Sequence, residues 1–178
     1  GLDREVLADL DGKVLQPSGL NQDRRRGLEA KLAALVLPDP AVRPAGLEFR
    51  ASAELGANAF ALPGGSVVVL DALVELAEDD AEIVAVLLHE LGHVAGRHAL
   101  RQMLQASAVG LAMAWYLGDF SNLLAAAPAL VLEARYAREF ERDADNFAAE
   151  TLRANGLSAG RLADMLLKLE TARQSRLD

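Results

Sequence analysis

The stretch "AVLLHELGHVAGRHAL", residues 85–100, decides the fold of this chain. Most of it reads as an apolar helix, yet it places an acid, Glu90, between His89 and His93. Residues four apart lie about one helical turn apart on the same face, so both imidazoles can bind one metal ion. Glu90 lies about 100° around the helix from His89 and flanks that ion. This is the H-E-x-x-H motif, which combines two zinc ligands and a general base on one helix. The alternative is a pair of core histidines, with Glu90 bound to an arginine.

A third protein ligand is needed, because a catalytic zinc is bound by three side chains and a water. The chain has no cysteine, so the ligand must be His, Asp or Glu. His98 follows His89 by nine residues, which on a continuous helix is nearly the opposite face. We therefore reject His98 as a ligand and expect a polar residue at the helix exterior.

Carboxylates on a later predicted helix are better candidates for the third ligand. The stretch "REFERDADNFA" (138–148) places Glu141 and Asp145 four residues apart, on one face. One acid could bind the metal while the other orients a histidine N–H. The alternative is a solvated face with ion pairs between neighbouring turns.

The rest of the chain predicts an α+β fold that is mostly helical. Asn21 is expected to cap a helix to about Val36, and Asp71 a short helix to about Ala77. Further helices are expected at 80–106, 134–154 and 158–175, and strands at 47–52, 58–62 and 66–70. We predict a hairpin across 58–70 and a small antiparallel sheet near the H-E-x-x-H helix.

Composition limits the partners of the chain. A length of 178 residues suits one domain, and a net charge of −8 argues against nucleic acid as a partner. Residues 107–132 are strongly apolar but are interrupted at 118–122, so neither half reaches the roughly 20 residues of a spanning helix. We favour a pair of core helices; the alternative is a surface that meets a membrane or an apolar substrate.

Four segments in order resemble the HtpX, BepA and CAAX-prenyl-protease-related zinc metallopeptidases, whose soluble cores are called minigluzincins. The segments are "NAFALPGG" (58–65), "LLHELGHVAGRH" (87–98), "YAREFERDADNFA" (136–148) and "LADMLLKLE" (162–170). Asp143 stands where this family usually has Glu. The resemblance covers about 45–170 and is far more specific than the five-residue motif alone.

This resemblance implies a zincin-like (gluzincin) core with one zinc ion and a set of site residues. It implies zinc ligands His89, His93 and Glu141, Glu90 as general base, Asp145 as the partner of a ligand histidine, and substrate binding along Asn58, Ala59, Phe60 and Ala61. Unpaired backbone groups on a strand edge would bind an extended peptide with little sequence preference.

The sequence thus predicts a single catalytic domain over 1–178, with a helical extension at 1–44 and a peptidase core at 45–170. It is expected to cleave extended or unfolded proteins, including membrane-associated ones, in the bacterial periplasm or at a membrane, as in protein quality control. The alternatives are a latent or chaperone-like module that binds unfolded clients, and a helical interaction domain without metal.

One family feature is missing from this sequence. Members often carry a further histidine after the last helix, near the metal or the oxyanion, and this sequence has no fourth histidine. Arg138, Tyr136 and Arg161 are the weak candidates to stabilise the oxyanion. No signal peptide is evident at 1–13, and either a mature form or an excised domain fits the sequence.

Overall fold

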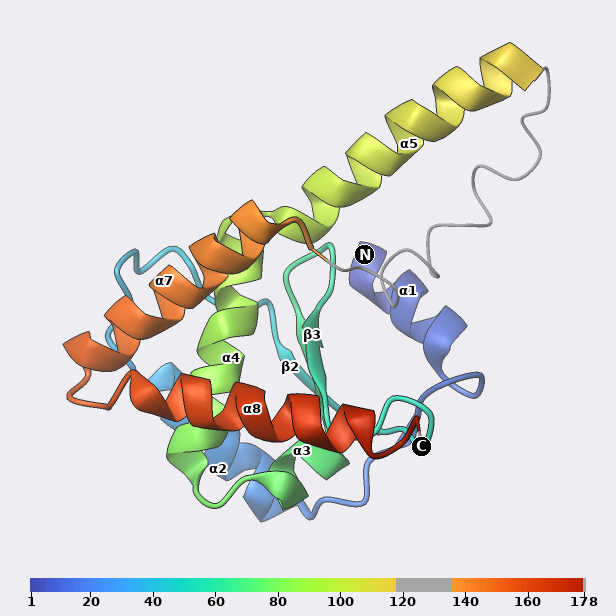
Figure 1. The fold of residues 1–178 in the computed structure, drawn as a ribbon. Coiled ribbons are helices and arrows are strands. Elements are labelled where there is room, and N and C mark those ends of the chain that lie inside the picture. The colour runs from blue at the N-terminus through green and yellow to red at the C-terminus, as the bar shows by residue number, and fades with distance from the viewer. Residues whose placement is uncertain (118–135, 178) are drawn as a thin grey trace.

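The computed structural model describes residues 1–117 and 136–177 and has the expected α+β architecture (Figure 1). Its helices are α1 (Leu2–Leu10), α2 (Gln22–Ala33), α3 (Asp71–Leu76), α4 (Asp80–Ala95), α5 (His98–Leu117), α7 (Arg138–Ala154) and α8 (Gly160–Gln174). Its strands are β1 (Gln16–Pro17), β2 (Leu47–Ala51), β3 (Ala59–Ala61) and β4 (Val67–Leu70). The predominantly helical α+β prediction is confirmed.

The sheet has the order β1-β2-β4-β3 and is mixed, which corrects the wholly antiparallel sheet that we expected. The hairpin across 58–70 is present, since β3 pairs antiparallel with β4, but β2 pairs parallel with β4. Strand direction alternates along the chain, and β4 lies between β2 and β3. All four residues of β4 are buried, which suits a central strand. The two-residue strand β1, in a segment that reads as a turn, pairs with β2.

Helix α4 is the centre of the larger core (Figure 1). It contacts α7 and α8, which cross it, and also α2 and β3. Every residue from Glu82 to His93 is buried, which explains why its apolar residues are not confined to one stripe. Asp79 caps its N-terminus by accepting a hydrogen bond from the Glu82 N–H at 3.1 Å.

The helix predicted over 80–106 is in fact two helices. Helix α4 ends at Ala95, Gly96 is its C-cap, and Arg97 adopts a left-handed φ of 50°. A residue in this conformation reverses the chain and ends a helix. The new helix α5 therefore starts at His98 in another direction.

Most other helix ends match their predictions. Asn21 caps α2 by accepting from the Arg24 N–H at 2.8 Å. Helix α7 ends at Asn155–Gly156, where Gly156 has a φ of 71°. Asp71 does not cap α3, because that helix begins one residue earlier than expected and Leu70 is its N-cap.

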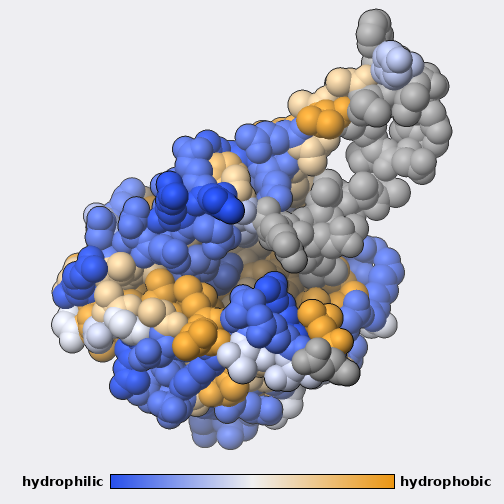
Figure 2. Space-filling view, viewed as in Figure 1, coloured by the Kyte–Doolittle hydropathy of each residue, from blue (hydrophilic) through white to orange (hydrophobic). Residues whose placement is uncertain are grey.

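Helix α5 projects away from the body of the molecule (Figures 1 and 2). Its first residues are buried, but Leu104, Val109 and Tyr116 are 63%, 66% and 79% exposed. This contradicts the prediction of a core helix for 107–117, because the described part of the chain does not cover these side chains. The predicted break at 118–122 and the second apolar run lie outside the described residues. Within the ranges described, no helix combines the length and the apolar character that crossing a bilayer requires.

Candidate metal centre

The close crossing of α4 and α7 positions the candidate site. At the crossing, Gly92 faces Ala144, and a Cβ at position 92 would lie 2.7 Å from the Ala144 Cα. The absent side chain therefore permits a helix approach that other residues would prevent. The side chains of α7 that face α4 are buried, and they include Phe140, Ala144 and Ala148. This packing places Glu141 next to the histidines of α4.

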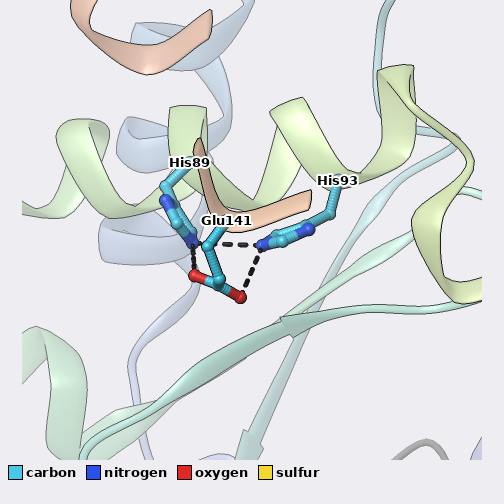
Figure 3. Close-up of side chains that lie close together, drawn as sticks. All are labelled: His89, His93 and Glu141. Carbon is cyan, nitrogen blue, oxygen red and sulfur yellow. Dashed lines mark hydrogen bonds and ion pairs between the residues drawn. The ribbon is translucent and has the colours of Figure 1, made fainter. Parts of the chain in front are cut away.

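His89, His93 and Glu141 point toward one another across this crossing (Figure 3). The Nε2 atoms of the two histidines are 3.1 Å apart. Glu141 Oε2 lies 3.5 Å from His89 Nε2, and Glu141 Oε1 lies 3.6 Å from His93 Nε2. Both imidazoles are buried, whereas the Glu141 side chain is 44% exposed.

The geometry of the three side chains fits a metal ion. Two ligand atoms on a tetrahedral zinc, each at about 2.1 Å, lie roughly 3.4 Å apart. The distance between the two Nε2 atoms, and the distance from each of them to its nearer Glu141 oxygen, are close to this value. Taking one ligand atom from each residue, all three lie within 4.8 Å of one another, and Zn²⁺ accepts two nitrogens and one oxygen as donors. The residues can therefore hold one divalent cation without rearrangement of the helices.

Charges around the triad favour a cation. Burial alone would lower the pKa of His89, but hydrogen bonds with Asp145 and Glu141 outweigh burial and raise the pKa to about 10. His89 Nδ1 donates to Asp145 Oδ1 at 3.0 Å. Burial, together with the nearby His89 and His98, lowers the pKa of His93 to about 3, so His93 is neutral. The neutral His93 imidazole can thus act as a ligand, and the carboxylates of Asp145 and Glu141 beside His89 attract positive charge.

Glu90 lies between α4 and the sheet. Burial raises the pKa of its carboxyl to about 7, which is near the value that suits a general base at neutral pH. Its Oε2 accepts a hydrogen bond from the Ala61 N–H at 3.1 Å. The acid is therefore fixed to the strand that the sequence assigns to substrate.

That strand, β3, is the edge of the sheet among the described strands. The Leu70 N–H of β4 donates to the Asn58 carbonyl at 3.1 Å, and the Leu62 N–H donates to the carbonyl of Ser66, the residue before β4, at 2.7 Å. In an antiparallel pair every second residue directs its N–H and C=O groups away from the partner strand. These are Ala59, whose N–H donates to the Asn58 side chain, and Ala61. Asn58, Ala59, Phe60 and Ala61 thus lie along this edge of the sheet, where Ala61 contacts Glu90 and where Ala59 and Ala61 are buried.

His98 was predicted to lie at the helix exterior, and that position is wrong. His98 is fully buried, and its Nδ1 lies 2.9 Å from His93 Nδ1. The prediction assumed a continuous helix, and the turn at Gly96–Arg97 instead brings His98 back beneath His93. A glycine just after an apolar helical run, with a basic residue in the last turn, is a recognised stop signal, and Gly96 after His93 pointed to this turn.

The candidate oxyanion residues lie in different places. Tyr136 stacks on His93, with ring centroids 4.0 Å apart, and burial raises the pKa of its hydroxyl. Arg161 pairs with Asp79 at 2.8 Å, at the start of α4. Asp79 precedes His89 by ten residues, about 15 Å along the helix, which excludes Arg161 from the site. Arg138 is exposed at the start of α7.

Comparison with known proteins agrees with this geometry. The family model described as peptidase family M48 matches residues 21–175. The metalloprotease LoiP of Escherichia coli K12 is 33% identical over 130 residues, which are 67% of this chain and 51% of LoiP. The metalloprotease YcaL of the same organism is 32% identical over 112 residues, 57% of this chain and 42% of YcaL.

A third relative is the beta-barrel assembly-enhancing protease of Yersinia pestis, 30% identical over 134 residues, which are 67% of this chain and 27% of that protein. The chain therefore spans about half or less of these curated relatives. The match to the family model covers most of the chain, and the metallopeptidase resemblance drawn from the sequence is confirmed. The chain belongs to peptidase family M48.

Proposed function

We propose that this chain is the catalytic domain of a zinc-dependent endopeptidase, with His89, His93 and Glu141 as the ligands of one zinc ion. The observation that carries the proposal is the convergence of these three side chains beside a buried carboxyl, Glu90. We assign residues 45–170 to the peptidase core and 1–44 to a helical extension of the same domain.

The residues divide the chemistry among them. A zinc ion held by the triad would polarise the scissile carbonyl and lower the pKa of a bound water. Glu90, whose pKa of about 7 suits proton transfer in both directions, accepts the water proton and then gives it to the leaving amine. Asp145 orients His89 by accepting its Nδ1–H.

The proposed substrate is an extended or unfolded polypeptide. It binds as an added strand along Asn58–Ala61, with the outward C=O groups of Ala59 and Ala61 as acceptors, because the N–H groups of these two residues already donate to Asn58 and Glu90. A cavity of about 320 Å³ continues from Ala61 past His93 to the start of α5. Its lining is mostly small or apolar, so it suits an apolar substrate side chain.

A chaperone-like role is the second candidate, and helix α5 supports it. Leu104, Val109 and Tyr116 are exposed on this helix, which projects from the body of the molecule (Figure 1). Such surface suits contact with unfolded clients or with a membrane protein. We propose that 107–132 makes this contact and that the protein acts in the bacterial periplasm or at a membrane, in protein quality control.

The test is reversible removal of the metal. The purified chain is treated with a chelator, and its degradation of casein is measured before treatment, after it, and after zinc is restored. The proposal predicts about one bound zinc per chain, loss of cleavage with the metal and recovery with zinc. Cleavage that persists in chelated, zinc-depleted protein would contradict it. Zinc binding with no cleavage in any sample would favour the binding module.

A further inference from the structure

His98 is the buried titratable residue that the proposed mechanism does not use. It is reached through the turn at the end of α4, where Arg97 takes the left-handed conformation. This turn directs the His98 ring back toward α4, so that its Nδ1 lies 2.9 Å from His93 Nδ1. A non-glycine residue in that conformation is uncommon and indicates a position fixed by its surroundings.

The His98 ring has little freedom to move. It stacks on Phe140 with ring centroids 4.3 Å apart and planes 5° from parallel. Its other edge packs on Gly96, where an added Cβ would lie 2.1 Å from His98 Nε2. The Nε2 atom is buried without a hydrogen-bond partner in the described structure, and Asp143 Oδ2 lies 3.8 Å away.

The short distance between the two Nδ1 atoms imposes a rule on their protons. Since two nitrogens at 2.9 Å form one hydrogen bond, one donates and the other accepts. A neutral imidazole that presents its Nε2 lone pair to a metal carries its proton on Nδ1. His93 is then the donor and His98 the acceptor, and the proton of His98 sits on Nε2, toward the Asp143 carboxylate.

The two histidines of α4 then have equivalent support. His89 donates its Nδ1–H to Asp145, and His93 donates its Nδ1–H to His98. We propose that His98 is a positioning residue that holds His93 in the tautomer and orientation needed to bind the metal. This inference rests on the proposed zinc site and adds a residue to it.

Two substitutions separate hydrogen bonding from packing. His98→Asn keeps an acceptor, since the Asn Oδ1 occupies roughly the place of the His Nδ1. His98→Leu keeps a similar volume without an acceptor. We measure zinc affinity by competition with a chromogenic chelator, and the melting temperature of each protein in excess EDTA.

We expect His98→Leu to weaken zinc binding by about 10- to 100-fold, the usual loss when the partner of a ligand histidine is removed. His98→Asn should recover most of that affinity. The cobalt-substituted proteins give an independent signature, because a misplaced His93 changes the visible absorption bands of Co²⁺ in His98→Leu. Gln105→Leu, at an exposed position of the same helix, is the control and should match wild type.

Gly96→Ala tests the same inference without altering His98. The backbone of Gly96, with φ −75° and ψ −7°, accepts alanine, so any loss of zinc affinity arises from displacement of the His98 ring. Unchanged zinc affinity in His98→Leu would overturn the inference, as would equal losses in His98→Leu and His98→Asn. If wild type bound no zinc, the proposed function itself would be wrong. If wild type binds zinc and Glu141→Gln abolishes that binding, the proposed zinc site stands, and the His98 variants then test the inference alone.

Discussion

The contact between Gly92 and Ala144 gives a prediction whose size follows from the structure. In Gly92→Ala the new Cβ would lie 2.7 Å from the Ala144 Cα and 3.1 Å from the Ala144 carbonyl oxygen. Carbon atoms in favourable contact are about 3.5–4.0 Å apart. The backbone of α7 must therefore move away from α4 by about 1 Å, because backbone atoms cannot rotate aside as a side chain can.

Gly92→Ala is expected to change both the stability of the fold and the turnover of the enzyme. Overpacking of this kind costs about 1–3 kcal/mol of unfolding free energy, while alanine gains about 1 kcal/mol over glycine inside a helix. Glu141 lies three residues before Ala144 on α7, so the shift also moves this proposed ligand. A displacement of about 1 Å can reduce turnover by about 100-fold.

The matched control is Gly27→Ala in α2, where an added Cβ meets nothing within 4 Å. It should stabilise the chain by about 0.5–1 kcal/mol and leave activity unchanged. Urea unfolding and hydrolysis of a quenched fluorescent peptide measure both quantities. If Gly92→Ala were as stable and as active as Gly27→Ala, the close approach of α4 and α7 would not be what positions Glu141.

Two further predictions concern charged groups. Glu141→Gln keeps the side-chain size but removes a charged ligand, so zinc affinity in a chelator competition should fall markedly; an unchanged affinity would exclude Glu141 as the third ligand. Lys168→Met leaves the buried Glu82 without its cation, since Lys168 Nζ donates to Glu82 at 2.8 Å, and the melting temperature should fall. Burial alone would raise the pKa of Glu82, but hydrogen bonds from Lys168 and from the Glu78 N–H hold it below its ordinary value of 4.5. The ionised form therefore stabilises the fold above pH 4.5, and the difference in melting temperature between wild type and Lys168→Met should shrink as the pH falls below that value.

The sequence predicted the site well where the signal was local. A spacing of four residues is enough to place His89 and His93 on one face of a helix, because helical geometry fixes it. The choice of Glu141 over its acidic neighbours came from the family resemblance. Periodicity indicates the apolar face of α7, with Phe140, Ala144 and Ala148, that packs on α4, but it does not show which acid beside that face reaches the histidines. The approach of Glu141 to the histidines depends on the close contact at Gly92, and only the packed structure reveals that contact.

The features that were missed depend on contacts between distant residues. The parallel pairing of β2 with β4 follows from β4 taking the central place in the sheet, which strand patterns do not determine. The buried position of His98 depends on one left-handed residue, Arg97, and a break there changes the direction of everything that follows. The exposure of α5 is a third case, since an apolar sequence is compatible with a core helix or with a contact surface.

The proposed chemistry depends on Glu90 as the general base, and a single pair of proteins tests that role. Casein degradation and zinc content are determined on the same preparations of wild type and Glu90→Gln. We expect equal zinc in both, cleavage by wild type, and loss of cleavage in Glu90→Gln, because the amide cannot accept the proton of water. Cleavage by zinc-loaded Glu90→Gln at a rate near that of wild type would contradict that role.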